Sequence, residues 1–476
     1  MPAAFLSEDS IDHSLASVRA PNPISAPVVT PHATTRVVRG VPVVFWIGWG
    51  VCLLVSALVC RSLYADGAYA VLELLRAPGH YIDYDAHRSF ASYVTQTPVL
   101  IGQWLGVAQV AAYAALYTAG VHALPAMLFL TALSLAVRTP MLFAATGAAI
   151  VIFGFGANFI NTEANLFLAL AWLAAVILVL PGRRPVLRGF VLPSLAFLSL
   201  RIYEGMLLVG PVLATAAYIA SRETDDAHER IGLTFAAPCF LLAALIGFSS
   251  LIAPRDPGNA AGFLAIAFRY LSNPQVFVLG AALCSLAAIT PIPARARLAL
   301  TAASGAFAAV FMWQMIRTQG YYAYGLYYYN RSFLVCLLPL AIAALLGVQR
   351  VRPAWLAQPL AYGAGIAIVI PFAAVVAVDL MGSARWLTYE RSFCEMLAQP
   401  PPASPIEQLK RTGAVTGWGW THPALSILLR EHGSLAMVHN DPGLWQPFDP
   451  DVPIALTYRG ACENRLLANM PLSKPR

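Results

Sequence analysis

The chain has 476 residues, of which 59% are hydrophobic and only 11% are charged, and its mean hydropathy is +0.66. Soluble domains carry about 25% charged residues, so this composition excludes a soluble globular protein and indicates a polytopic membrane protein. The net charge of +7 comes mainly from arginines in short turns between apolar runs, and no basic run with interleaved aromatic residues indicates a nucleic-acid partner.

Residues 1–40 are polar and rich in proline, serine and threonine, and we expect a disordered tail there. Arg19, Arg36 and Arg39 precede the first apolar run, so the positive-inside rule places this tail in the cytoplasm. Residues 41–60 are apolar over a length that crosses about 30 Å of hydrocarbon as one helix.

Twelve apolar segments lie between residues 41 and 380, which predicts an all-α polytopic domain over this range. Basic turns at 182–188, 293–297 and 349–353 belong in the cytoplasm, and so, less clearly, does the turn 221–230. The first loop (62–98) and all residues after 381 are then external. The segments are 41–60, 99–119, 121–137, 140–158, 164–180, 187–202, 204–220, 231–253, 275–290, 298–317, 332–348 and 359–380.

An even number of crossings contradicts a cytoplasmic N-terminus and an external C-terminus. We therefore expect 11 transmembrane helices, or 13 if a long run hides a hairpin. The misassigned segment is expected between 99 and 181, where loops are short and only Arg138 marks a side. One segment there would be re-entrant or shorter than a full crossing.

The tail, 381–476, is more polar, and we expect a small α/β domain outside the cytoplasm. The stretch from Thr421 to Gly433 has the pattern of an amphipathic helix, and residues 434–441 that of a strand. Five of the seven cysteines lie in apolar runs, whereas Cys394 and Cys462 lie in the tail, where an oxidising compartment would allow them to form a disulfide.

The first polar loop holds three aspartates, Asp66, Asp83 and Asp85, directly after the first apolar run. Residues 68–76 follow Asp66 with helical spacing, and Ala68, Leu72 and Leu75 share one face. A short helix on the membrane surface would hold Asp66 at the bilayer boundary, where low dielectric raises a carboxyl pKa toward the range of a general base. The alternative is a solvated aspartate that ends the first helix.

This layout resembles the GT-C superfamily of polytopic glycosyltransferases, which use polyprenyl-phosphate-linked sugars and carry acidic residues in the first external loop before a membrane-surface helix. The chain departs from it at Gly67, where many members have a second acidic residue. The resemblance implies an inverting transfer with Asp66 as base and Asp83 or Asp85 assisting. It also leaves open a divalent metal, Mg²⁺ or Mn²⁺, held by Asp66 and Asp85.

Two further polar groups interrupt the apolar sequence. Asn161 and Glu163 lie in a polar stretch between two apolar segments, which suits either a sugar or metal site or a solvated turn. Arg201 and Glu204 have i, i+3 spacing in apolar surroundings, so they can pair with each other. Arg201 would then either bind a lipid phosphate or take part in a structural ion pair between helices.

Three arginines are candidates for binding the donor phosphate from external loops. Arg317 and Arg331 flank a tyrosine-rich loop, and Arg269 lies in an interfacial segment, 262–272. The tyrosines themselves are expected to be residues of the interfacial aromatic belt.

The sequence therefore predicts a membrane glycosyltransferase that moves a sugar from a polyprenyl-phosphate donor to a cell-envelope glycan or lipid acceptor. We expect a bacterial-type inner membrane, with the tail in the periplasm. Two alternatives stay open at this point: a protein of the O-antigen ligase or polymerase type, which relies on loop arginines without an aspartate base, and a secondary transporter. The absence of visible symmetry between the two halves disfavours the transporter.

Overall fold

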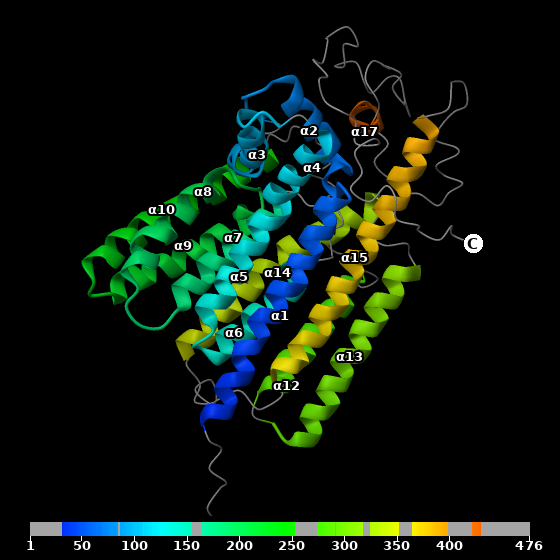
Figure 1. Cartoon of the computed structure of the whole chain (residues 1–476). Helices are drawn as coiled ribbons and strands as arrows, with labels where there is room; N and C mark the ends of the chain where they lie inside the picture. The colour runs from blue at the N-terminus through cyan, green and yellow to red at the C-terminus, as the bar shows by residue number, and fades with distance from the viewer. Residues whose placement is uncertain are drawn as a thin grey trace, which may run out of the picture.

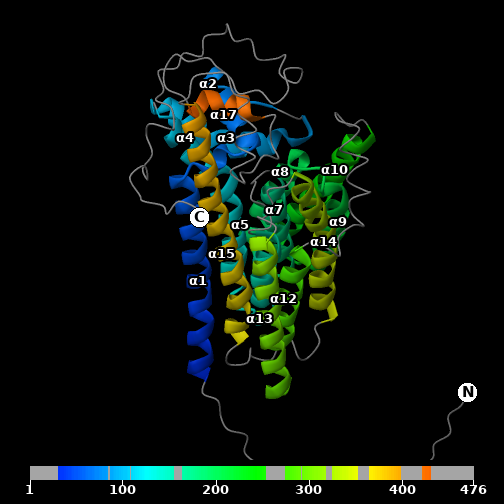
Figure 2. The same ribbon diagram turned by 90° about the vertical axis from the view of Figure 1, so that its right-hand side faces the viewer.

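The computed structural model describes residues 31–83, 86–107, 109–154, 163–252, 274–290, 292–317, 324–351, 364–397 and 421–429. Within these ranges the chain is almost entirely helical and contains no β-strand. Long helices form a bundle, and three short helices lie together at one end of it (Figure 1, Figure 2).

The bundle helices are α1 (Pro31–Leu58), α4 (Val110–Thr118), α5 (Leu124–Ala136), α6 (Pro140–Ala149), α7 (Glu163–Val179), α8 (Leu192–Leu198), α9 (Met206–Glu223), α10 (Ala227–Ile252), α12 (Gln275–Ile289), α13 (Ala294–Arg317), α14 (Tyr324–Val351) and α15 (Ala364–Leu397). The end of the bundle is covered by α2 (Asp66–Arg76), α3 (Ser89–Trp104) and α17 (His422–Leu429).

Five helices in the described ranges are long and apolar enough to cross a membrane, and four shorter apolar helices accompany them. Large apolar side chains are exposed on the outer faces of several of these helices, among them Trp46, Ile47, Leu54, Phe235, Leu298 and Trp313. So much exposed apolar surface is unfavourable in water but favourable in contact with lipid. The expectation of a helical membrane protein is therefore confirmed at this level.

α7 is the central helix of the bundle. Every residue from Ala164 to Leu178 is buried, and all of them except Asn165 are apolar, as expected of a helix surrounded by other helices. α5, α9 and α14 pack against it. Because α7 begins at Glu163, this packing fixes one acidic side chain at the end of the bundle that α2 and α3 cover.

The prediction of separate segments at 99–119 and 121–137 is wrong. α4 and α5 are joined by a π-helical segment, Ala119–Ala123, and form one continuous helix from Val110 to Ala136. The first part of 99–119 belongs instead to α3, which ends at Trp104. Gly120 and His122 resemble a break in the sequence, but a π-helical turn carries them inside a helix.

The helix that we predict after Asp66 is confirmed as α2. Ala68 and Leu72 are fully buried and Leu75 is 4% exposed, as their shared face requires. Leu425, Leu428 and Leu429 of α17 join the same apolar cluster, so part of the C-terminal tail covers the helix that begins at Asp66.

Other predictions meet the structure only in part. The helix expected after Thr421 is confirmed as α17, but the strand at 434–441 lies outside the described residues, so nothing in the described part of the tail supports an α/β domain. α1 begins at Pro31, inside the tail that we expect to be disordered. The interfacial segment 262–272 also lies outside the described residues.

The continuous helix from Val110 to Ala136 makes a testable prediction about accessibility. With single cysteines placed at Gly106, Ala119 and Thr139 in a cysteine-free chain, a membrane-impermeant maleimide should label position 106 in intact cells. Position 139 should react only after permeabilisation, and position 119 should stay unreactive because it lies inside the continuous helix and not in a loop between two helices. Labelling of position 119 from water would restore the two-segment interpretation.

Candidate functional site

Asp66 is the first residue of α2 and directs a carboxyl group into the protein. Its Oδ1 is inaccessible to solvent and has no hydrogen-bond partner among the described residues, although the residue as a whole keeps intermediate exposure. Burial and the negative charge of Glu163 raise the pKa of Asp66 from 3.8 to about 6, while Arg331 and Arg88 act in the opposite direction. A carboxyl with this pKa is suited to exchange a proton near neutral pH.

The backbone before Asp66 forms a tight elbow that connects α1 to α2. A 3₁₀ turn, Arg61–Leu63, is flanked by two non-glycine residues with positive φ, Cys60 at 53° and Ala65 at 55°. Such conformations cost about 1–3 kcal/mol each and persist only where the surrounding structure imposes them. The unfavourable backbone conformation of Ala65, directly before Asp66, indicates that the surrounding structure holds this elbow in one geometry at a cost in stability.

Gly67 explains why this chain has no second acidic residue beside Asp66. A Cβ atom at position 67 would overlap the carbonyl oxygen of Ser62, and an aspartate would require the elbow to open. The absence of a side chain at position 67 therefore has a steric cause in this elbow.

Arg88 lies at the far end of the same loop, in a short 3₁₀ turn, Ala86–Arg88. Its Nε donates a hydrogen bond of 2.8 Å to Glu204 Oε1, and its Nη2 lies 2.6 Å from the same oxygen. The remaining Nη1 lies 4.0 Å from Glu163 Oε2. One guanidinium group thus joins the first loop to the start of α7 and to the segment before α9.

A second arginine, Arg331, lies near the same tyrosine ring as Arg88. The guanidinium of Arg88 lies 5.0 Å from the centroid of the Tyr203 ring, and that of Arg331 lies 5.8 Å from it. Both distances are within the range of cation–π attraction. Arg331 comes from α14 and also acts electrostatically on Asp66, so two guanidinium groups and Asp66 belong to one site.

The site as a whole combines three acidic and two basic side chains from five separate parts of the chain: Asp66, Arg88, Glu163, Glu204 and Arg331. The side chains of Arg88, Glu163 and Glu204 keep 25%, 23% and 21% exposure. These three side chains are therefore partly accessible from outside the bundle. A proton acceptor beside two guanidinium groups is an arrangement suited to substrates that carry both a hydroxyl and a phosphate.

Several predicted residues are not part of this site. Arg201 is exposed, and Glu204 pairs with Arg88 instead of Arg201. Asp83 and Arg317 are exposed as well, the latter at the last residue of α13. Asp85, Asn161 and Arg269 lie outside the described residues.

Sequence reasoning missed Arg88 and Tyr203. Arg88 follows the predicted acidic pair in the loop, so an arginine next to candidate carboxylates was the available signal. Tyr203 had no such signal, because tyrosines are common near membrane interfaces.

The predicted metal site is not tested. No group of three or more His, Cys, Asp or Glu side chains that could hold a metal occurs in the described part of the chain. One of the two predicted ligands, Asp85, lies outside it. Binding of Mg²⁺ or Mn²⁺ therefore stays a prediction.

Of the two cysteines in the predicted disulfide, the structure describes only Cys394. Cys394, near the end of α15, is disulfide-bonded, while Cys52, Cys60, Cys239, Cys284 and Cys336 are free thiols. The expected partner, Cys462, lies outside the described residues.

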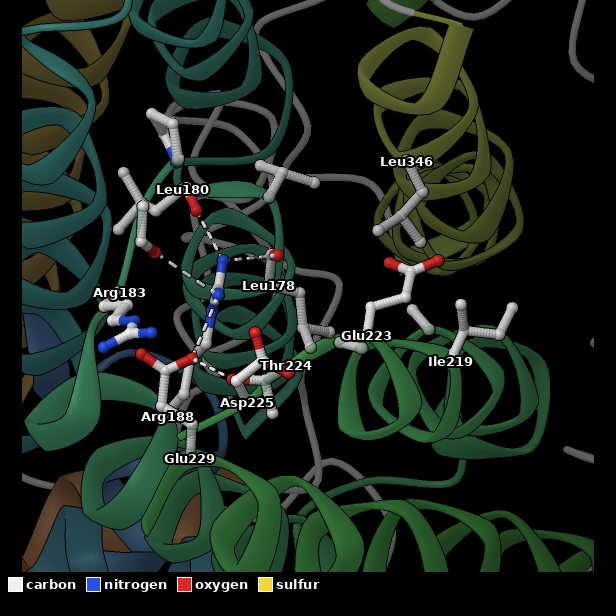
Figure 3. A pocket seen from close by; sticks show the side chains of 15 residues that line it. Leu178, Leu180, Arg183, Arg188, Ile219, Glu223, Thr224, Asp225, Glu229 and Leu346 are labelled. Atoms are coloured by element: carbon white, nitrogen blue, oxygen red, sulfur yellow. Dashed lines mark hydrogen bonds and ion pairs between the residues drawn. The ribbon is translucent and has the colours of Figure 1, made fainter. Parts of the chain in front are cut away.

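A separate cavity of about 680 Å³ lies between the ends of α7, α9 and α14 (Figure 3). Arg188 occupies its wall and donates to the carbonyl oxygens of Leu178 and Leu180 at the end of α7. Its Nη1 also lies 3.3 Å from Oε2 of the buried Glu229. These contacts satisfy a helix C-terminus and tie the turns 182–188 and 221–230 together, so the polar lining has a structural role. No predicted site residue lines this cavity.

Comparison with known proteins adds no assignment: no protein-family profile, no curated protein and no solved structure matches the chain.

Stability should depend on pH through Asp66. Its pKa is raised in the folded state, so folding favours the protonated form, and stability should fall as the pH rises between 3.8 and about 6. Asp66→Asn removes this charge and should stabilise the protein above about pH 7, by on the order of 2–3 kcal/mol, with little effect below about pH 4. Thermal unfolding in detergent across this pH range measures the difference. A variant that is less stable than the wild type above pH 7 would show that the carboxylate is well paired.

The elbow gives a second prediction. Gly67→Ala should lower stability by about 1–3 kcal/mol, because the new methyl group overlaps the Ser62 carbonyl oxygen. Gly50→Ala in α1 is the matched control, since nothing lies within 4 Å of an added Cβ there. Unfolding temperatures of the two variants test the elbow geometry, and equal values would contradict it.

Proposed function

We propose that this protein is a membrane-embedded glycosyltransferase that transfers a sugar from a polyprenyl-phosphate donor to a cell-envelope glycan or lipid acceptor. The observation that carries the proposal is the Asp66 carboxyl, which has a buried Oδ1 and a pKa of about 6 and lies close enough to Arg88 and Arg331 for both to lower that pKa. It combines the two functions that such a transfer needs, a general base and a cationic site for phosphate.

In the proposed reaction the acceptor hydroxyl oxygen attacks the anomeric carbon of the donor sugar. The bond from that carbon to the phosphate oxygen breaks, and polyprenyl phosphate leaves from the opposite face. Asp66 accepts the hydroxyl proton as the new glycosidic bond forms. The result is inversion at the anomeric carbon.

Arg88 and Arg331 would stabilise the leaving phosphate. A guanidinium group has five N–H donors, and Glu204 engages only the Nε and Nη2 side of Arg88. The Nη1 side faces Glu163 at 4.0 Å, a distance too long for a hydrogen bond. The N–H groups of Nη1 would therefore be available to donate to a phosphate oxygen while the other side of the guanidinium stays on Glu204.

The bundle supports a count of 11 passes. Nine passes are the long or shorter apolar helices: α1, the joined α4–α5 helix, α6, α7, α10, α12, α13, α14 and α15. We count α9 and α8, the latter together with the helical turns that extend it over 187–201, as the other two. It removes the conflict between a cytoplasmic N-terminus and an external C-terminus, because α3 is not a crossing. The basic turn 182–188 would then face the cytoplasm, at the opposite end from Asp66.

The disulfide at Cys394 supports an external position for the end of α15, because structural disulfides persist in oxidising compartments. α17 packs on α2 at the same end of the bundle. In the proposed reaction the tail would therefore lie next to the position of the acceptor. We propose the bacterial inner membrane as the location, with this end in the periplasm.

The transfer is tested with Asp66→Asn in a reaction that contains the native membrane's lipid-linked sugars and cell-envelope glycan. The rate should fall by about 10²–10⁴-fold, the usual contribution of a general base. In the wild type the rate should rise with pH through about 6 and then level off, because only the carboxylate accepts a proton. Asp83→Asn is the matched control, since Asp83 is exposed in the same loop.

Full transfer by Asp66→Asn would contradict the proposal. It would favour the ligase or polymerase type, in which arginines act without an aspartate base. Uptake of a solute into proteoliposomes that lack lipid-linked sugars would favour the transporter.

A further inference from the structure

We propose that the buried ion pair between Arg61 and Asp379 is a positioning device that fixes the elbow before α2 and so determines where the Asp66 carboxyl stands. Both residues would act on Asp66 through the elbow, so we call them positioning residues. The inference deepens the proposed function by naming what holds its base, but the device would act on Asp66 whatever reaction the site performs.

The ion pair lies where α1 ends against α15. Arg61 Nη1 is 2.9 Å from Asp379 Oδ1, and it also donates to the Asp379 carbonyl oxygen at 3.1 Å and to Ser383 Oγ at 3.1 Å. The side chains of Arg61 and Asp379 are only 3% and 2% exposed. Three acceptors on one nitrogen, from one turn of α15, leave Arg61 little freedom to move.

α15 also holds the residues on either side of Arg61. Trp386 Nε1 donates a 2.6 Å hydrogen bond to the Val59 carbonyl oxygen, at the point where α1 ends. The ring of Tyr64 meets those of Trp386 and Tyr389 edge-on, with centroids 5.6 Å and 6.3 Å apart. Val59, Arg61 and Tyr64 of the elbow thus all contact α15.

α4 holds the elbow from the opposite side. Ser62 Oγ donates a 2.6 Å hydrogen bond to the Ala114 carbonyl oxygen. Gly67 then packs directly against the Ser62 carbonyl oxygen. With Ser62 fixed on one side and Tyr64 on the other, the backbone has a single path to Asp66, and Ala65 adopts its positive φ on that path.

An ion pair suits this task better than an apolar contact would. Burying two charges costs desolvation, so a buried pair is weak support for stability, but it tolerates few alternative geometries. A displaced Arg61 would leave Asp379 as an unpaired buried charge. The pair therefore disfavours every position of the elbow except one, and Asp66 lies only five residues beyond Arg61.

α2 itself offers a matched control. Arg76 and Glu73 form an ion pair with the same 2.9 Å distance, but their side chains are 19% and 23% exposed and both belong to α2. Glu73→Gln removes one charge from the helix that begins at Asp66 without touching its attachment to α15. A general effect of charge loss near Asp66 would appear in this variant as well.

The test is the titration of Asp66 itself, measured by infrared spectroscopy on the purified full chain in lipid. The carboxylic acid band that is present in the wild type and lost in Asp66→Asn reports this group. Its midpoint is expected near pH 6, set by burial, by Glu163 from α7, by Arg331 from α14 and by Arg88 from the first loop.

Asp379→Asn should lower this midpoint toward the ordinary aspartate value of about 3.9, because the released elbow exposes Asp66 to water. Ser383→Ala, which removes one of the three contacts of Arg61, should shift it in the same direction by less. Asp379→Glu keeps the charge and should bring the midpoint back toward that of the wild type. Glu73→Gln should leave it unchanged.

An unchanged midpoint in folded Asp379→Asn would overturn the proposal. If that variant does not fold, Ser383→Ala decides, because it deletes a single hydroxyl, and an unchanged midpoint there would overturn the proposal too. An equal shift in Glu73→Gln would also contradict it. The readout needs no transfer reaction, so failure of the proposed function would leave this result intact.

Discussion

A carboxyl group held away from water, with charged neighbours of both signs, is the constraint on which this structure depends. Burial raises the pKa of Asp66, and the negative charge of Glu163 acts in the same direction. Arg331 and Arg88 offset part of that effect and leave the pKa at about 6. The site is therefore tuned by the balance of opposing charges, and that balance requires side chains from distant segments to lie close enough to act on Asp66 electrostatically.

The bundle provides that meeting point. α7 is buried along its length and begins at Glu163, so its first residue is fixed by apolar packing that has no part in the chemistry. α14 brings Arg331 to the same end, and the segment before α9 brings Glu204 to Arg88 across 116 residues of sequence. The rigid helices set the positions, and the first loop closes over them with Arg88 and Asp66 at its two ends.

The sequence predicted the parts of this account that depend on local pattern. Composition indicated the membrane bundle, and the spacing after Asp66 predicted α2 and its buried face. The continuous Val110–Ala136 helix was missed because the predicted segments 99–119 and 121–137 divide the chain at Gly120, whereas a π-helical segment carries Gly120 inside the helix.

Ion pairs between residues far apart in the chain could not be predicted from the sequence. The i, i+3 spacing of Arg201 and Glu204 suggested a local pair, but the tertiary structure joins Glu204 to Arg88 instead. Arg61 and Asp379, which are 318 residues apart, gave no signal at all. Their positions looked like an ordinary helix end and an isolated aspartate in an apolar run.

The most direct test of the central claim is the pKa of Asp66 in two variants, Glu163→Gln and Arg331→Gln, followed by the infrared band of its carboxylic acid. If the three side chains share one site, removal of the glutamate charge lowers this pKa below about 6, and removal of the arginine charge raises it. Shifts in opposite directions are the predicted result. A pKa that moves in neither variant would show that Asp66 stands apart from these residues and would contradict the account.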